Sequence, residues 1–210
     1  MRHPYFLLAF LCFCVFTVLT DAQERYKILF LNMSPVEIAG RECNVNDCFD
    51  IDEKIVWKNE KQVMKVLSLS SQKQSVIAAR EFSGGRHKTL SSYLVQTKRL
   101  STREGASLPL PQLKEYLSDT FYLIDSIKVK TLLPVNESHF FYAGYEYAGE
   151  FIYKKLSSTD NDFIIDYSLF IIDGVPVRPF ETPLSVYYMD NEKGESMLIT
   201  DQLLLIPAVL

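Results

Sequence analysis

Histidine is scarce in this chain of 210 residues, which contains only His3, His87 and His139. The sequence also lacks the Gly-x-Ser-x-Gly, His-Glu-x-x-His and phosphate-loop motifs that carry common hydrolytic and nucleotide chemistries. These absences disfavour an enzyme. Because catalytic triads assemble from residues distant in sequence, one alternative stays open. It is a hydrolase that uses His87 or His139 with a serine, cysteine or carboxylate partner.

Cysteine is scarce as well. Of the four cysteines, Cys12 and Cys14 lie in an apolar N-terminal segment, which leaves Cys43 and Cys48 for the folded chain. In an oxidising compartment the pair allows one disulfide across the loop 44–47. Spacing does not establish pairing, so the two residues are equally well explained as small core residues on adjacent strands.

The chain has no excess of positive charge, since 22 Lys and Arg residues face 26 Asp and Glu residues and the net charge is −4 at pH 7. This balance excludes a generally basic protein that coats nucleic acid. Acidic residues cluster in two places but lack the spacing of a calcium-binding loop, with its central glycine and final glutamate. We therefore predict no metal site and no cofactor. The two clusters are Asp47, Asp50, Asp52 and Glu53, and Asp160 with Asp162.

Long apolar runs are confined to the N-terminus. The run Phe6–Leu19 follows basic residues, is shorter than the ~20 residues of a membrane-spanning helix, and is followed by small residues at 20–22. These features predict a signal peptide over residues 1–22 and a secreted chain that starts at Gln23. The other apolar run, Leu203–Leu210, is short and contains Pro207, so no transmembrane segment is expected after the signal.

Residues 26–82 alternate short β-type runs with polar turns. Short strands with turn signals at this spacing predict a small SH3-like barrel or meander. We expect it to form a first domain over residues 23–96. The runs are Lys27–Leu31, Glu42–Val45, Lys54–Trp57, Gln62–Leu69 and Gln74–Ala79.

The next segment changes character. Leu90, Tyr93 and Leu94 have the i, i+3, i+4 spacing of a short amphipathic helix, which would end the first domain. Residues 97–112 then contain Pro109 and Pro111 among glycine and serine, a composition typical of an interdomain linker.

The second half is again rich in β-type runs. Short strands spaced by turns predict an antiparallel β-sandwich over residues 113–210. The expected fold class is therefore all-β, with one short helix. The runs are Thr120–Leu132, Phe140–Tyr147, Glu150–Tyr153, Phe163–Ile172, Leu184–Met189, Ser196–Thr200 and Leu203–Ile206.

The most distinctive segment is the aromatic run Phe140–Tyr147, which continues into Phe151 and Tyr153. Aromatic residues favour strands and stabilise hairpins by pairing across strands, and that packing role is the more frequent one. Tyrosines on a solvated sheet face instead form a platform that stacks on sugars or peptides. Tyr145 and Tyr147 are our candidate contact residues for such a platform.

Positive charge is concentrated between Lys73 and Arg103, in an otherwise acidic chain. A local excess of this kind can mark contact with an anionic surface or an acidic partner, although charged runs are often simply solvated. The candidate contact residues are Arg86, Lys88, Lys98 and Arg99.

Three groups of passages carry a resemblance that covers most of the chain after residue 22. They are Ile38–Phe49 with Lys54–Trp57 and Gln62–Val66; Leu90–Thr102; and Phe140–Tyr142, Tyr145–Tyr147 and Lys154–Leu156 with Tyr187-Tyr188. These passages are similar to a group of uncharacterised secreted proteins of gut-dwelling Gram-negative anaerobes of the Bacteroidetes type. The resemblance implies secretion across the inner membrane to the periplasm or cell surface. It also implies that Cys43 and Cys48 are core substitutions, with or without a bond, and it supplies no functional residues.

We therefore expect a secreted, non-catalytic binding or scaffolding protein whose partner is another envelope protein or a surface polymer, and not nucleic acid. Two β domains without catalytic motifs offer faces and loops rather than a reactive centre.

Overall fold

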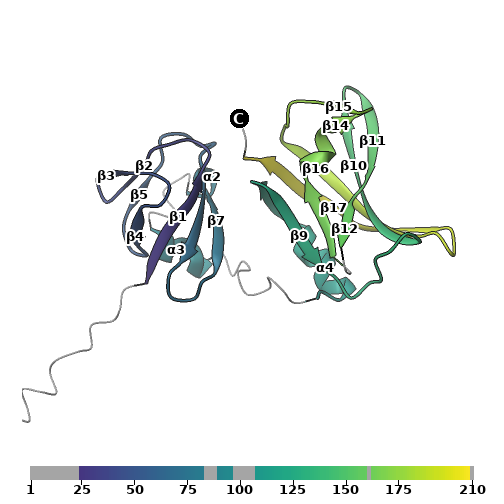
Figure 1. Ribbon diagram of the computed structural model, residues 1–210, viewed down its shortest axis with the longest axis horizontal. Coiled ribbons are helices and arrows are strands. Elements are labelled where there is room, and N and C mark those ends of the chain that lie inside the picture. Colours follow the sequence, from purple (N-terminus) through teal and green to yellow (C-terminus); the bar gives the residue numbers. More distant parts are fainter. Residues whose placement is uncertain (1–23, 83–88, 97–106, 160–161, 209–210) are drawn as a thin grey trace, which may run out of the picture.

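The computed structural model describes residues 24–82, 89–96, 107–159 and 162–208 (Figure 1). The predicted signal peptide lies outside these ranges. So do His87 and the four basic candidates Arg86, Lys88, Lys98 and Arg99. The described chain is dominated by strands in several sheets, which confirms the all-β class.

The N-terminal half, residues 24–82 and 89–96, contains two open sheets rather than a closed barrel. One sheet has the order β4-β1-β6-β7 and the other the order β3-β2-β5. The strands are β1 (Arg25–Leu31), β2 (Val36–Ile38), β3 (Arg41–Cys43), β4 (Cys48–Asp50), β5 (Ile55–Val56), β6 (Val63–Ser68) and β7 (Gln74–Ala78).

Two short helices complete the core of this half: α2 (Ala79–Phe82) and α3 (Leu90–Gln96), the latter at the position predicted from its spacing. Phe82 stacks on Tyr93, with ring centroids 5.3 Å apart, and meets Trp57 edge to face at 5.4 Å. The helices therefore cover the apolar side of the sheets, where Ile28, Met64 and Ile77 are fully buried.

A further helix, α4 (Leu110–Leu117), begins inside the segment predicted to be a linker. Its N-cap is Pro109 and Pro111 lies in its first turn, where a missing backbone N–H costs no helical hydrogen bond. Leu113 and Leu117 are completely buried in the core of the C-terminal half. Residues 110–112 are thus part of a packed element, not of a linker.

The C-terminal half, residues 107–159 and 162–208, is built on a five-stranded sheet of order β11-β10-β16-β17-β8. A three-stranded sheet, β12-β13-β9, and the hairpin β14-β15 accompany it. The strands are β8 (Thr120–Leu123), β9 (Ser126–Lys130), β10 (His139–Tyr147), β11 (Glu150–Lys155), β12 (Ser157–Thr159), β13 (Asp162–Asp166), β14 (Ile171–Ile172), β15 (Val175–Pro176), β16 (Thr182–Asp190) and β17 (Glu195–Pro207).

This half is layered like a sandwich, as predicted, but its pairing is not wholly antiparallel. Strand β8 runs parallel to β17 at one edge of the large sheet. The two strands are far apart in sequence, so no tight hairpin fixes their relative direction. Between the layers, Phe141 of the large sheet stacks on Phe163 of the small sheet, with ring centroids 4.1 Å apart.

Among the described residues, the two halves touch through a small apolar cluster and an ion pair. Val63 and Ala78 of the N-terminal half are buried with Ile124 and Ala208 of the C-terminal half. Beside them, the Arg80 guanidinium donates two hydrogen bonds to the Glu181 carboxylate, at 3.1 and 2.9 Å, which lowers the pKa of Glu181.

Candidate functional site

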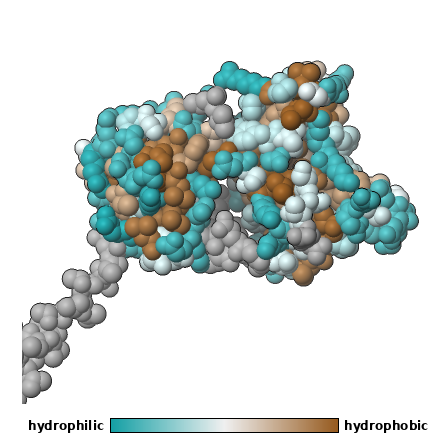
Figure 2. Space-filling model, in the orientation of Figure 1, coloured by the Kyte–Doolittle hydropathy of each residue, from teal (hydrophilic) through white to brown (hydrophobic). Residues whose placement is uncertain are grey.

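Apolar surface is visible on both halves in Figure 2, broken up by hydrophilic residues. Two of the most exposed large apolar side chains, Phe151 (51%) and Tyr153 (60%), lie on the same strand, β11. Two residues apart on one strand, they point to the same side of the sheet. They therefore identify this side of the sheet as a candidate binding surface.

Alternation along the neighbouring strand β10 decides which aromatic residues join this surface. Phe141, Ala143 and Tyr145 are buried in the core between the layers. The even-numbered residues Phe140 and Tyr142 are only partly buried and project from the opposite side. The large sheet thus has an inner face that packs and an outer face that carries aromatic rings.

Strand register brings these rings together. Tyr142 of β10 faces Lys155 of β11 on one side and Tyr187 of β16 on the other. The rings of Tyr142 and Tyr187 stack almost parallel, at 9°, with centroids 4.9 Å apart. Tyr153 meets both rings edge to face, at 5.9 Å and 6.2 Å. The outer face therefore presents one continuous aromatic cluster across three strands.

Gly144 makes room for part of this cluster. It is the cross-strand partner of Tyr153, and a Cβ atom there would lie 2.6 Å from Cε1 of Phe151 and 3.1 Å from Cε1 of Tyr153. A Cβ atom at 2.6 Å would overlap the Phe151 ring, so the bare backbone of Gly144 leaves room for both rings beside β10. Phe151 and Tyr153 also contact each other, at 5.0 Å.

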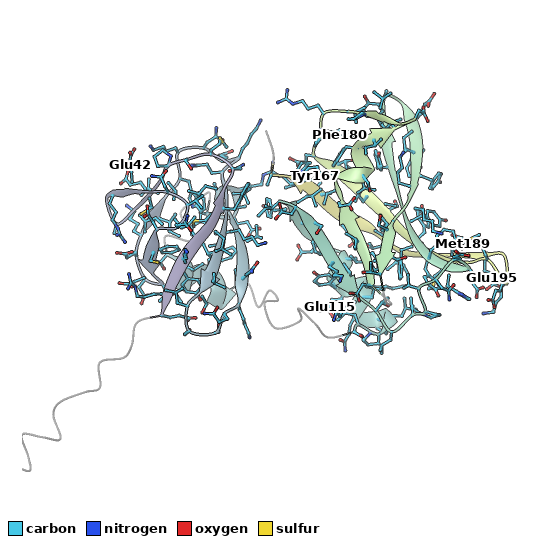
Figure 3. All side chains as sticks on the ribbon, in the orientation of Figure 1. Glu42, Glu115, Tyr167, Phe180, Met189 and Glu195 are labelled. Atoms are coloured by element: carbon cyan, nitrogen blue, oxygen red, sulfur yellow. The ribbon has the colours of Figure 1, made fainter. Side chains whose placement is uncertain are left out.

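Polar groups border the cluster. The hydroxyl groups of Tyr142 and Ser196 lie 2.6 Å apart, and the Lys155 ammonium lies 4.0 Å above the ring of Phe140. Met189 follows Tyr187 on the outer side and, with Glu195, lies toward the projecting end of the β16–β17 hairpin (Figure 3). We call this surface the aromatic face; its rings are Phe140, Tyr142, Phe151, Tyr153 and Tyr187.

The two tyrosines singled out from the sequence do not belong to it. Tyr145 is only 1% exposed, its hydroxyl donates to the Leu169 carbonyl, and burial raises its pKa. Tyr147 is partly buried on the same inner side and packs on Phe180, with centroids 5.6 Å apart. The sequence indicates the correct strand, β10, but the two predicted tyrosines lie on its inner side. A shift of one residue along a strand exchanges the two faces of the sheet.

His139, named for the hydrolase alternative, is held at both ring nitrogens. Nε2 lies 3.4 Å from Oδ1 of Asp190, its cross-strand partner, and Nδ1 lies 3.2 Å from Oδ1 of Asn136. The Lys193 ammonium, 3.0 Å from the same Asp190 carboxylate, lowers its pKa. These contacts tie the start of β10 to the end of β16, and the partners that the described residues give to the two ring nitrogens are Asn136 and Asp190.

Cys43 and Cys48 are free thiols in the structure. Cys43 is buried, which raises its pKa, whereas Cys48 is partly exposed. The loop between them is closed instead by Asp47, whose carboxylate accepts a hydrogen bond from the Asn44 backbone N–H at 2.7 Å.

The acidic residues beyond this loop bind protein groups. Glu53 pairs with Arg41 at 3.1 Å, and Asp52 accepts a hydrogen bond from the Ser91 hydroxyl. Within the described ranges no group of His, Cys, Asp and Glu side chains is arranged to hold a metal ion. No described helix has the length and apolar character needed to cross a bilayer.

Comparison of the chain with protein-family models, with curated proteins and with solved structures finds no match.

Proposed function

We propose that this chain is a secreted, non-catalytic binding protein of the cell envelope and that its aromatic face binds a surface polysaccharide. The observation that carries the proposal is the exposure of Phe151 and Tyr153 on a sheet face where Tyr153 also contacts the rings of Tyr142 and Tyr187. Large aromatic side chains are normally buried, so a contiguous exposed group of them is characteristic of a binding surface.

A polysaccharide suits this surface for two reasons. The rings of Phe151 and Tyr153 offer apolar area for the C–H-rich faces of sugar rings, and aromatic side chains lose little rotational freedom on binding. The hydroxyls of Tyr142 and Ser196 and the ammonium of Lys155 lie at the border, where sugar hydroxyls can exchange hydrogen bonds with them. The surface is a sheet face, which matches an extended polymer.

The location supports the same partner. The predicted signal peptide over residues 1–22, with the resemblance to secreted envelope proteins, would deliver the chain to the periplasm or cell surface, where such polymers occur. The hydrolase alternative is less favoured, because His139 is committed to Asp190 and Asn136.

The test is retention of the secreted protein on a panel of insoluble or gel-embedded polysaccharides. Tyr153→Ala should weaken retention by about tenfold or more, the loss typical of removing a central stacking residue. Leu132→Ala is the matched control, since Leu132 is 67% exposed and lies outside the aromatic face. Unchanged retention in Tyr153→Ala, or an equal loss in Leu132→Ala, would exclude the aromatic face as the site.

A further inference from the structure

Strand β11 is an open edge of the five-stranded sheet. In the part of the chain that the structure describes, its only paired neighbour is β10. The Leu156 backbone N–H donates to the Phe141 carbonyl, which fixes the even-numbered residues of β11 as those bonded to β10. The backbone groups of Phe151, Tyr153 and Lys155 therefore point away from the sheet. Figure 1 shows β11 on the side of the C-terminal half that is remote from the N-terminal half.

These three residues combine two properties. Their backbone N–H and C=O groups face the open edge, and their side chains lie on the outer face with the aromatic rings. An unpaired row of this kind is a template for another strand. A strand added here would extend both the hydrogen-bond ladder and the aromatic face.

We propose that the added strand is β11 of a second copy, paired antiparallel about a two-fold axis at Tyr153. In this register Tyr153 faces the partner subunit's Tyr153, and Phe151 faces the partner subunit's Lys155. All three outward-pointing residues then form hydrogen-bonded pairs, so the ladder is satisfied along the whole edge. The contact is isologous, the usual arrangement in soluble homodimers.

The charge pattern of β11 favours this occupant. Glu150 begins the strand, and Lys154 and Lys155 end it. Antiparallel self-pairing sets the acidic end against the basic end and places Glu150 diagonally opposite the partner subunit's Lys154. Parallel self-pairing would align like charges, so it is disfavoured.

Aromatic contacts support the same register. Lys155 already packs over an aromatic ring, that of Phe140 at 4.0 Å, and self-pairing places the ring of the partner subunit's Phe151 beside it. A register shifted by one residue would set the odd-numbered residues of one copy opposite the even-numbered residues of the other, whose backbone groups β10 already uses.

The consequence is a single sheet to which each copy contributes five strands, with two aromatic faces side by side. The pairing rests on the edge of β11 and not on what the aromatic face binds. Two linked faces would bind a repeating polymer with higher avidity than one face does.

Cysteine substitution on the full secreted chain tests both the pairing and its register. Hydrogen-bonded partners in antiparallel strands have Cα atoms about 5.5 Å apart, within the range that a disulfide bridges. Tyr153→Cys should therefore form a covalent dimer on mild oxidation. Phe151→Cys and Lys155→Cys should each form little covalent dimer alone, because neither thiol faces another thiol in this register. An equal mixture of the two should cross-link.

Two controls make the result decisive. The unsubstituted chain measures any contribution of Cys43 and Cys48, and Val175→Cys places a thiol at a residue that is 62% exposed on β15. Cross-linking of Val175→Cys equal to that of Tyr153→Cys, or cross-linking of Phe151→Cys alone as strong as in the mixture, would overturn the proposed register.

Light scattering on the unsubstituted chain provides an independent measurement. It should give the mass of a dimer, and Lys155→Glu should weaken the dimer by about tenfold because its contact with Phe151 occurs twice. A monomeric mass at high protein concentration, together with no cross-link in Tyr153→Cys, refutes the dimer. Polysaccharide retention by such a monomer would leave the proposed function standing.

Discussion

The two faces of the five-stranded sheet use the same residue type for different purposes. On the inner face the hydroxyls of Tyr145 and Tyr188 donate to the carbonyls of Leu169 and Pro134, so these rings are fixed parts of the core. On the outer face Tyr142, Tyr153 and Tyr187 contact one another at the surface. Aromatic content alone therefore does not identify a binding surface; which residues of the strand point outward does.

Replacing the inner Tyr145 by alanine should have the largest effect. It leaves a cavity in a closely packed core, and the free energy of unfolding should fall by about 3 to 5 kcal/mol. The outer counterpart Tyr153→Ala should change stability by less than about 0.5 kcal/mol. Urea denaturation of both variants measures the difference, and equal losses would mean that the two faces do not differ as described.

High pH should destabilise the protein through its buried tyrosines. Burial raises the pKa of Tyr26 to about 12 from its ordinary value of 10.0, and it also raises the pKa values of Tyr145 and Tyr188. Since the folded state favours the neutral phenols, their contribution is complete below about pH 10 and is lost as the pH rises toward 12. Denaturation at a series of pH values should show this decline.

A single variant assigns that decline to a buried group. Tyr26→Phe should make the dependence on pH shallower, because it removes a phenol whose pKa burial raises to about 12. Equal slopes in Tyr26→Phe and the unsubstituted protein would contradict the assignment.

Gly144→Ala should reduce stability less than Tyr145→Ala does, and it should also reduce binding by the aromatic face. The new methyl group would overlap the Phe151 ring, which lies at the surface and can move aside, so the loss of stability should be near the lower end of about 1 to 3 kcal/mol. Retention on polysaccharide should fall as well, because the new methyl group displaces the rings of Phe151 and Tyr153. Full stability with full retention would show that Gly144 does not shape the face.

Removing single hydroxyl groups should give the smallest effects. Tyr145→Phe leaves the Leu169 carbonyl without its donor in the core and should cost about 1 kcal/mol. Tyr142→Phe loses a contact with Ser196 at the surface, where water replaces it, and should be nearly neutral for stability. Denaturant midpoints with unchanged slopes would measure both; a larger loss in Tyr142→Phe would reverse the comparison.

Much of the fold could be predicted from the sequence. For the site, Glu146 indicates which residues of the aromatic strand point outward. The run Phe140–Tyr147 is aromatic at both odd and even positions, so hydrophobicity alone does not set its phase. Glu146 does, because a charged side chain in such a strand belongs on the solvent side and places the even-numbered residues outward. Tyr145 and Tyr147 then face inward.

Other features depend on distant partners or on context. The prolines at 109 and 111 indicate a break, yet the spacing of Leu110, Leu113 and Leu117 is that of an amphipathic helix, and proline is compatible with its first turn. The approach of Tyr187 to Tyr142 depends on pairing of β10 with β16, strands separated by five others in the chain order. No local pattern encodes such a pairing.

The five-stranded sheet can close only after β17 has been synthesised. Among the described residues β17 is the last strand, yet it lies inside the five-stranded sheet between β16 and β8, and Ala208 just beyond it contacts the N-terminal half. During synthesis the sheet stays divided, with the edges of β16 and β8 unpaired, until β17 has emerged. Unpaired strand edges are templates for pairing with other chains, so the insertion of β17 covers both edges in one step.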